Sequence, residues 1–248
     1  MSTIYILWLR QIKRYFRSRS RIVGSLGQPL LFLLALGFGF GPIFQKAGGG
    51  NYIQFLAPGI IAMGILFIAI FSGIEIIWDR QFGFLKETLV APVSRTKIVL
   101  GRILGGATTS SLQGVMVFAL SLLIGFKPES YLMIPLALIF MFMIAILFTA
   151  LGTAVASVLE DMQGFQLIMN FLVMPLFFLS GALFPLSGLP SVIGDIAVVN
   201  PLSYGVDALR GSLTGVYHFG FSTDVFVLIA VIILFTGIGS YLFSKIEI

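Results

Sequence analysis

Residues 78–97 read WDRQFGFLKETLVAPVSRTK, and they place six charged side chains between two long apolar runs. The chain as a whole is far more apolar: 58% of its 248 residues are hydrophobic, only 10% are charged, and the mean hydropathy is +1.06. This composition is typical of an integral membrane protein. Because one crossing takes about 20 apolar residues, the chain has room for about seven or eight spans at most. We therefore expect residues 1–248 to form one transmembrane domain, with 78–97 as a loop outside the bilayer.

Six hydrophobic runs are long enough to predict transmembrane helices. They lie at about 22–42, 55–78, 103–126, 131–158, 165–184 and 225–243. Lysine and arginine gather in alternate connections: 12 would be cytoplasmic and three external if the N-terminus is inside. The positive-inside rule therefore places both termini in the cytoplasm. The first run follows six basic residues, as a secretion signal would, but it is longer than a signal core and we expect it to stay uncleaved.

The first 21 residues predict an amphipathic helix that lies in the headgroup layer. Trp8 and Tyr15 fall on its apolar side, whereas Arg10, Lys13 and Arg14 fall on the other. Aromatic rings anchor at the membrane interface, and basic groups are attracted to anionic headgroups. Two interpretations stay open: the helix only orients the chain, or it takes part in function.

The charged segment itself predicts a short cytoplasmic helix between the second and third spans. Phe82, Leu85 and Leu89 recur at helical spacing, and Pro92 ends the pattern. Such a helix would present large side chains, Phe84 among them, to something outside the bilayer. The alternative is a solvated turn whose charges only fix the topology.

The connection between the last two spans, residues 185–224, predicts helices that lie in the interface or dip into the membrane and return. Its apolar pieces are too short to cross. Asn200 before Pro201 is a typical helix start, and Asp207 and Arg210 are three residues apart, close enough to form an ion pair. These helices either cap the outer mouth or act as a gate.

Few polar residues lie within the spans, and these few are the candidates for a substrate pathway. They are Thr108, Thr109, Ser110 and Gln113 in the third span and Asn170 in the fifth. Hydroxyl side chains in membrane helices also bond to backbone and hold helices together, so packing is the alternative role. Two pairs of glycines have the small-residue spacing of closely packed helices. They are Gly37 with Gly41 and Gly101 with Gly105.

Several kinds of site are disfavoured by the residues that are missing. The chain has no cysteine and one histidine, His218, so we expect no cysteine or multi-histidine metal site. It has no G-x-x-x-x-G-K-[ST] sequence to cradle nucleotide phosphates, and no H-E-x-x-H or G-x-S-x-G motif of a hydrolase. We therefore expect a chain that is not an enzyme and binds no cofactor or metal itself.

Two stretches together resemble the signatures of type-2 ATP-binding cassette (ABC) exporter permeases, closest to the daunorubicin-resistance branch. They are DRQFGFLKETLVAPVSRTKIVLGRIL at 79–104 and NPLSYGVDALRG at 200–211. The six spans, the N-terminal amphipathic helix and the long last external connection fit the same family, so the resemblance covers the entire chain. The family often has Glu-Gly-Thr where this chain has Gly83, Phe84 and Leu85, so finer features of the polysaccharide and lipo-oligosaccharide branches are not carried over.

The resemblance implies a permease that forms a homodimer in the membrane above two separate ATP-binding subunits, which would hold ATP and Mg²⁺. The charged segment would be the coupling helix, which fits a groove on the ATPase. Its matching positions are Phe82, Gly83, Phe84, Leu85, Lys86, Glu87 and Thr88, with a second contact at Glu160, Asp161 and Gln163. The external helices would form a re-entrant pair that closes the pathway. Its gate residues would be Asn200, Pro201, Tyr204, Asp207 and Arg210.

The expected function is export of amphipathic or lipid-like compounds, of the drug, lipid or glycolipid class, from the cytoplasm or the inner leaflet of a prokaryotic cell membrane. Spans rich in phenylalanine and methionine, with few fixed charges, suit such cargo. The alternative is a secondary transporter or channel, a class that favours ionisable residues in mid-span. No nucleic-acid partner is expected, because the basic residues follow a membrane surface.

Overall fold

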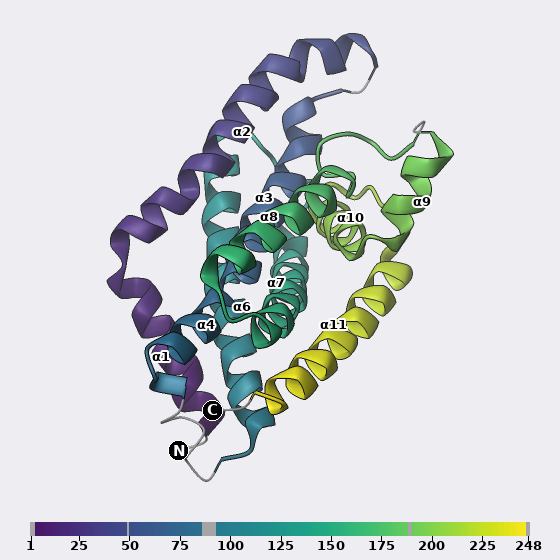
Figure 1. The fold of residues 1–248 in the computed structure, drawn as a ribbon. Helices are drawn as coiled ribbons and strands as arrows, with labels where there is room; N and C mark the ends of the chain where they lie inside the picture. The colour runs from purple at the N-terminus through teal and green to yellow at the C-terminus, as the bar shows by residue number, and fades with distance from the viewer. Residues whose placement is uncertain (1–2, 49, 86–92, 188–189, 247–248) are drawn as a thin grey trace.

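The computed structural model describes residues 3–48, 50–85, 93–187 and 190–246, and every regular element in these ranges is helical (Figure 1). In chain order the helices are α1 (Thr3–Arg17), α2 (Arg19–Lys46), α3 (Tyr52–Phe71), α4 (Ile74–Gln81), α6 (Arg95–Ile124), α7 (Ile134–Val158), α8 (Met162–Phe178), α9 (Ser191–Val199), α10 (Pro201–Thr214) and α11 (Phe221–Ser244). A single 3-10 turn, η1 (Tyr131–Met133), leads into α7. The expected all-helical class is confirmed.

Five helical segments within the described ranges are long and apolar enough to cross a membrane. They are Ile22–Lys46, Tyr52–Gln81, Arg95–Ile124, Tyr131–Val158 and Phe221–Ser244. The run expected at 165–184 forms a shorter helix, because α8 ends at Phe178 and has 17 residues. Beyond it, Gly181 takes the left-handed backbone conformation (φ 73°), which turns the chain away from the helix axis. α9 and α10 meet at a bend of 86° and form a broken span or a re-entrant loop, as the sequence led us to expect.

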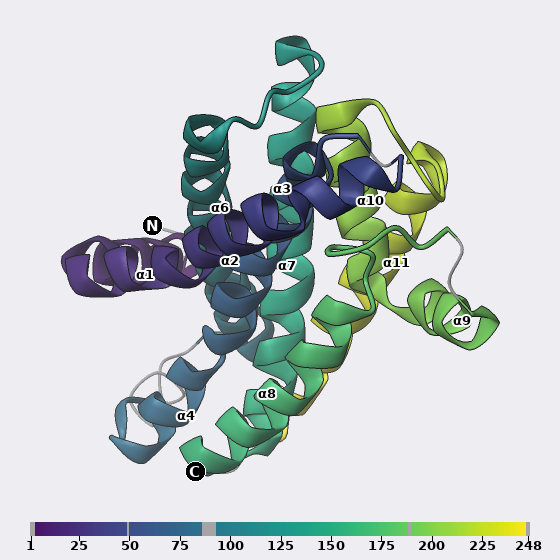
Figure 2. The ribbon, with the colours of Figure 1, turned by 90° about the horizontal axis from the view of Figure 1, so that it is seen from above.

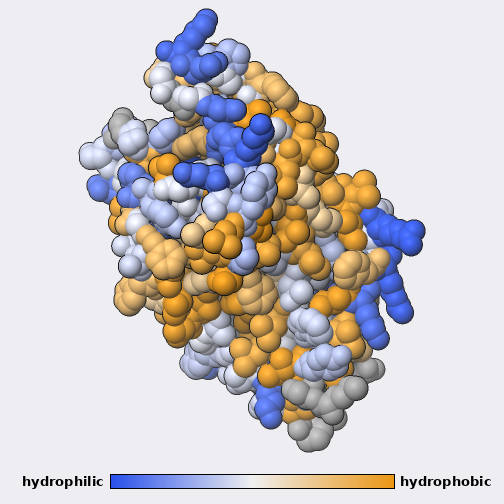
Figure 3. Space-filling view, turned by 180° about the vertical axis from the view of Figure 1, so that it is seen from behind, coloured by the Kyte–Doolittle hydropathy of each residue, from blue (hydrophilic) through white to orange (hydrophobic). Residues whose placement is uncertain are grey.

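The bundle is built around α3, which packs against α2, α6, α7 and α10. In the most apolar stretch of each span, 72% of the residues are buried in the span that contains α3, 17% in α2 and 11% in α11. α2 and α11 therefore lie on the outside of the bundle. Figure 2 shows α3 and α7 in the middle and α9 projecting from the side. Hydrophobic residues cover the middle of the face seen in Figure 3, and hydrophilic ones gather toward its ends, as expected for a protein that spans a bilayer.

The N-terminal helix expected over the first 21 residues is α1, and it packs closely against another helix of the bundle. It packs along the start of α6, where a Cβ added at Gly101 would lie 2.9 Å from Leu7 Cβ and one at Gly105 would lie 2.6 Å from Gln11 Cβ. The glycine pair of α6 thus serves the close packing that its spacing predicts. The pair in α2 does so only in part, because Gly37 faces Ile53 whereas Gly41 faces open space.

The closest helix approach occurs where α3 gives way to α4. A Cβ added at Gly73 would meet the carbonyl of Gly152 on α7, and a Cβ added at Gly152 would meet the carbonyl of Ile70. Backbone therefore touches backbone at this crossing, which only residues without a side chain allow. The contact fixes α7 against the point at which the second span changes from α3 to α4.

We expect Gly152→Ala to destabilise the fold by about 2–3 kcal/mol, because the added methyl group overlaps main-chain atoms that cannot change rotamer. The matched control is Gly237→Ala on α11, where nothing lies within 4 Å of the new Cβ. That change should leave stability unchanged or raise it by up to about 1 kcal/mol through helix propensity. Thermal unfolding of both purified variants in detergent gives the comparison, and equal midpoints would contradict the backbone contact.

Candidate functional site

The expected coupling segment begins directly after α4 and is described as far as Leu85. Gly83 turns the chain with a left-handed backbone (φ 79°) and open space around its Cα. The side chains on either side of it differ sharply: Phe82 is 80% exposed, Phe84 is 38% exposed and Leu85 is 2% exposed within the core. Lys86, Glu87 and Thr88, and hence most of the expected coupling helix, lie outside the described residues.

Arg10 of α1 lies over this turn. Its guanidinium carbon is 4.0 Å from the centre of the Phe84 ring, and its Nη2 donates to Asp79 Oδ1 at 3.3 Å. The other carboxylate oxygen of Asp79 accepts from Arg102 Nη2 at 2.6 Å. Asp79 and Arg102 are both buried, so their bond is screened little by water. One carboxylate on α4 therefore joins α1 to α6 beside the start of the coupling segment.

A second ion pair joins α1 to α4, one helical turn earlier on α4 and one turn later on α1. Arg14 of α1 lies 3.6 Å from the carboxylate of Glu75, and its guanidinium faces the Trp78 ring at 5.2 Å. Glu75 is buried. Arg10 and Arg14 are four residues apart, as are Glu75 and Asp79, so each pair falls on one side of its helix. This matched spacing is visible in the sequence, but the pairing of α1 with α4 was not predicted from it.

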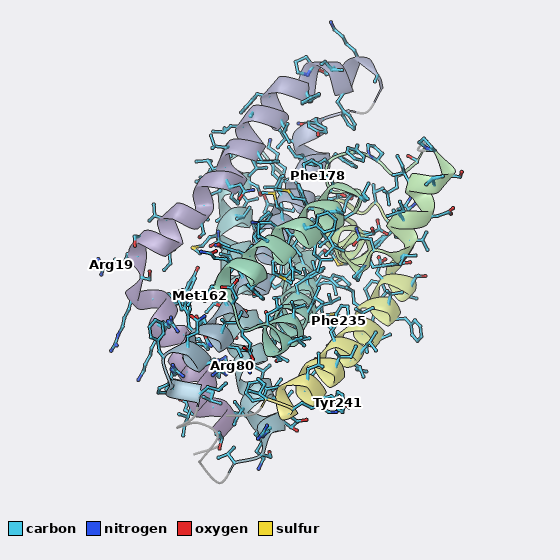
Figure 4. The ribbon with its side chains drawn as sticks, viewed as in Figure 1. Arg19, Arg80, Met162, Phe178, Phe235 and Tyr241 are labelled. Atoms are coloured by element: carbon cyan, nitrogen blue, oxygen red, sulfur yellow. The ribbon has the colours of Figure 1, made fainter. Side chains whose placement is uncertain are left out.

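The second expected contact with the ATPase, the loop before α8, is attached to the end of α4. Arg80 Nη2 lies 2.8 Å from Glu160 Oε1, and Gln81 Nε2 donates to the Glu160 carbonyl at 3.0 Å. The Trp78 indole N–H points to the sulfur of Met162. In Figure 4 Arg80 and Met162 lie on the same side of the bundle, whereas Arg19 points away from it.

The remaining residues of that loop have a local role and an exposed face. Asp161 begins α8 by accepting the amide of Gly164 at 2.6 Å, a usual helix cap. Gln163 is exposed. The structure thus places the 160–163 loop beside the beginning of the 82–88 segment, so one partner surface can reach both.

The candidate pathway residues either make hydrogen bonds within the bundle or lie on its surface. Thr108, Thr109 and Ser110 donate to backbone carbonyls one turn earlier in α6. Gln113 is buried and holds Ser25 of α2 through two hydrogen bonds of 2.9 and 3.1 Å. Asn170 is exposed on α8. These bonds match the packing alternative, and a pathway role for these residues stays a prediction.

The external residues form a tightly bonded bend. Asn200 accepts the amide of Leu202 at 3.0 Å and donates to the Leu176 carbonyl at 2.7 Å, so it both caps α10 and ties it to α8. Pro201 occupies the first turn of α10. The Tyr204 hydroxyl reaches back to the Val198 carbonyl of α9 at 2.7 Å, which holds the bend from inside.

The ion pair expected between Asp207 and Arg210 does not form. Asp207 is buried, and its carboxylate accepts the amides of His218 at 2.8 Å and Phe219 at 2.7 Å. Arg210 donates to the Gly181 carbonyl at 2.8 Å and stacks over the Phe55 ring at 4.1 Å. The expectation was wrong because backbone groups from other segments lie closer to each charge than the neighbouring side chain does.

Residues 2–214 match the model of the ABC-2 type transporter family, which covers most of the chain. The chain belongs to this family. Its permeases are membrane transport subunits rather than catalytic ones, and they generally work with an ATP-binding subunit. The general resemblance inferred from residues 79–104 and 200–211 is thereby confirmed at the level of the family.

Full-length relatives agree with the family match. The chain is 29% identical to the ycf38 protein of Cyanophora paradoxa over 95% of this chain and 87% of the relative. It is 26% identical to YadH, an inner membrane transport permease of Escherichia coli (strain K12), over 92% of this chain and 90% of that protein. It is also 30% identical to nodulation protein J of Rhizobium leguminosarum bv. viciae, over 78% of this chain and 75% of that protein. The protein is therefore a membrane-embedded transport permease.

Removing the shared carboxylate should be costly. We expect Asp79→Ala to destabilise the protein by about 3–5 kcal/mol, because it leaves the buried Arg102 guanidinium without its ion-pair partner. Glu160→Ala breaks an ion pair of similar length, but the Glu160 side chain is 76% exposed, so the loss should not exceed about 1 kcal/mol.

Thermal unfolding midpoints of the two purified variants give the comparison. The double variant Asp79→Ala/Arg102→Met removes both buried charges, and it should recover most of the stability lost in Asp79→Ala. Equal losses for Asp79→Ala and Glu160→Ala would contradict the proposed difference between a buried and an exposed pair.

Proposed function

We propose that this chain is the permease of an ATP-driven exporter, closest in type to the daunorubicin-resistance branch. It moves amphipathic or lipid-like compounds out of the cytoplasm or the inner leaflet of a prokaryotic cell membrane. ATP and Mg²⁺ are held by a separate ATP-binding subunit, two copies of which serve a homodimer of this chain. Both termini are cytoplasmic, in keeping with the distribution of basic residues.

The observation that carries the proposal is the exposed phenylalanine at the end of α4. Phe82 is 80% exposed, although it follows a helix that is firmly held by ion pairs to α1, α6 and the 160–163 loop. Both chain termini lie at this same end of the molecule in Figure 1. A large apolar side chain on a rigid support outside the bilayer is what a partner protein binds as an interface anchor.

The contacts around α4 connect it to α1, to α6 and to the loop before α8. A partner that moves Phe82 also moves α4, and with it Arg102 of α6 and Arg10 of α1 through the Asp79 carboxylate. Arg80 and Gln81 transmit the same displacement to the loop before α8. Hydrogen-bonded charges and packed helices of this kind form the contiguous network that coupling between distant sites uses.

A homodimer accords with the distribution of burial. α2 and α11 have large exposed apolar faces, and α8 exposes Phe171, Leu167 and Met174. A single copy of the bundle is packed through its centre by α3, which leaves little room for a substrate inside one chain. A pathway between two copies resolves this difficulty.

The alternative, a proton-coupled secondary transporter, has one observation in its favour. Asp224 at the start of α11 is completely buried beside Asp207, and neither of its carboxyl oxygens has a hydrogen-bond donor among the described residues. Buried ionisable residues within the spans are typical of secondary transporters. Reconstituted vesicles separate the two functions: export that needs the ATP-binding subunit and ATP supports our proposal, and export driven by a proton gradient alone contradicts it.

The test of the coupling surface is a set of three aspartate substitutions. Phe82→Asp should abolish capture of the co-expressed ATP-binding subunit, because the charged group would have to be buried unpaired in the interface at a cost of about 3 kcal/mol, or roughly a hundredfold in affinity. The variant should insert and purify normally, since Phe82 makes no contribution to the core. Phe84→Asp should have a smaller effect, because Arg10 can pair with the new carboxylate.

Leu85→Asp is the control for folding. Leu85 is 2% exposed in the core, so this change should reduce the amount of folded protein in the membrane rather than act on the partner alone. Membrane level, gel filtration, pull-down of the ATP-binding subunit and substrate-stimulated ATPase activity are measured for all three. A Phe82→Asp permease that still retains its ATP-binding subunit and transports would contradict the assignment.

A further inference from the structure

A polar hollow lies where α10 meets the start of α3. Figure 1 shows that these parts of the ribbon lie away from the chain termini. The hollow has a volume of about 330 Å³ and is closed on one side by the turn after α8 and on another by the chain that leads into α11. The residues that matter for its chemistry are Asn51, Gln54, Ser203, Asp207, Arg210 and Tyr217. They come from the start of α3, from α10 and from the chain that follows α10, so the fold assembles the hollow rather than any local motif.

Two buried polar groups of this hollow have no partner in the protein. The Ser203 side chain is 1% exposed, and its hydroxyl makes no hydrogen bond. The Nε of Arg210 is buried without an acceptor, although its Nη2 donates to the Gly181 carbonyl. Buried polar groups are nearly always hydrogen-bonded, because leaving one unpaired is costly. A ligand with hydroxyl oxygens could accept from Arg210 and both donate to and accept from Ser203.

The charges around the hollow exclude a strong preference for an ion. Arg210 contributes a positive charge and Asp207 a negative one, so together they are neutral. Asp207 is already occupied by the amides of His218 and Phe219. Burial, followed by the neighbouring charges of Asp224 and Asp207, raises the pKa of the Tyr217 hydroxyl, which keeps it protonated at neutral pH as a donor. A neutral ligand that both donates and accepts fits this set of groups better than a phosphate does.

An apolar groove begins within two residues of the hollow. It has a volume of about 610 Å³ and is lined by Phe171, Leu172, Pro175 and Leu176 of α8 and by Ile196 and Val199 of α9. Leu179 lines the groove and Ser180 the hollow; Pro201 lines the groove and Ser203 the hollow. Figure 4 labels Phe178, the last residue of α8, which directly precedes Leu179. A polar and an apolar hollow whose lining residues are neighbours in the chain at two points supply the two chemistries of an amphiphile.

We propose that the outer hollow binds the neutral, hydroxyl-rich head of an amphiphile whose apolar chain lies in the groove between α8 and α9. The proposal rests on the proposed export function and narrows its substrate class to uncharged, polyhydroxylated amphiphiles. Ser203 and Arg210 bond to the head, and Tyr217 is a further donor. The bound head joins α10 to the beginning of α3, and the chain contacts α9, so one ligand spans both sides of the external bend.

The binding test uses decyl glucoside with a photoreactive diazirine in its alkyl chain, added to the purified permease in phosphatidylcholine nanodiscs. We expect saturable labelling of α8 and α9 residues that line the groove. Unlabelled decyl glucoside should compete at least about tenfold better than decyl phosphate or decyltrimethylammonium, as the neutral hollow requires. Labelling that does not saturate, or better competition by either charged amphiphile, would overturn the proposal.

Two serines of α10 provide a matched pair of variants. Ser203→Ala removes a hydroxyl that is unpaired without ligand, so the unfolding midpoint should stay the same or rise while the affinity for decyl glucoside falls about five- to tenfold. Ser212→Ala removes a buried hydroxyl that donates to the Leu209 carbonyl and does not line the hollow, so the affinity should not change. Equal affinities for the Ser203→Ala variant and the unmodified protein would also overturn the proposal.

The assay needs neither ATP nor the ATP-binding subunit, so it separates this proposal from the export function. Loss of ATPase capture in Phe82→Asp with no binding of decyl glucoside would uphold the exporter and refute the amphiphile site. Specific binding of decyl glucoside, together with export that needs neither ATP nor the ATP-binding subunit, would uphold the site and refute the ATP-driven exporter.

Discussion

The carboxylate of Asp79 determines how α1, α4 and α6 are assembled at one end of this permease. Arg102 is buried on α6 and requires a counter-charge; Asp79 supplies it and uses its second oxygen to bind Arg10 of α1. Without that carboxylate, α6 would retain an unpaired cation in an apolar surrounding, and α1 would lose a bond to the bundle. The short helix α4, which has only eight residues, is thereby held between two neighbours. Its position in turn fixes where Phe82 leaves the bundle.

The N-terminal helix acquires a structural role from the same network. A basic amphipathic helix is expected to bind anionic headgroups with its charged side. Here Arg10 and Arg14 instead face Asp79 and Glu75, and the Trp8 indole donates to Thr108 of α6 at 3.0 Å. The helix is therefore bound to the protein through both its charged and its aromatic side chains. A part of the chain that the sequence describes as a membrane anchor is, in the structure, a brace for α4 and α6.

Sequence reasoning predicted most of the helices, because long apolar runs are a strong signal and the bilayer sets their length. A helix lies at each of the six runs expected to cross the membrane, although the fifth is shorter than expected. The broken pair around Asn200 and Pro201 was identified from its cap and its short apolar pieces, whereas most of the expected coupling helix lies outside the described residues. Sequence reasoning could not predict the partners of charged groups, since those depend on which helices become neighbours. Asp207 and Arg210 are adjacent on one helix face, yet each bonds to backbone from a distant segment. The exposure of Phe82 and the burial of Leu85 were equally hidden, because a helical pattern was assumed to continue through Gly83, where the backbone turns.

The two candidate sites lie at opposite ends of a single pair of helices. Phe55 of α3 stacks beneath Arg210 at the outer hollow, and Arg80 of α4 holds Glu160 at the coupling end. Between them the chain changes direction at Gly73, where α3 and α4 touch the backbone of α7 at Gly152. A backbone contact at that point limits sliding of the segment past α7. If an ATP-binding subunit moves α4, as we propose, the displacement is transmitted through this crossing to α3 and reaches Phe55, which stacks against Arg210 in the outer hollow.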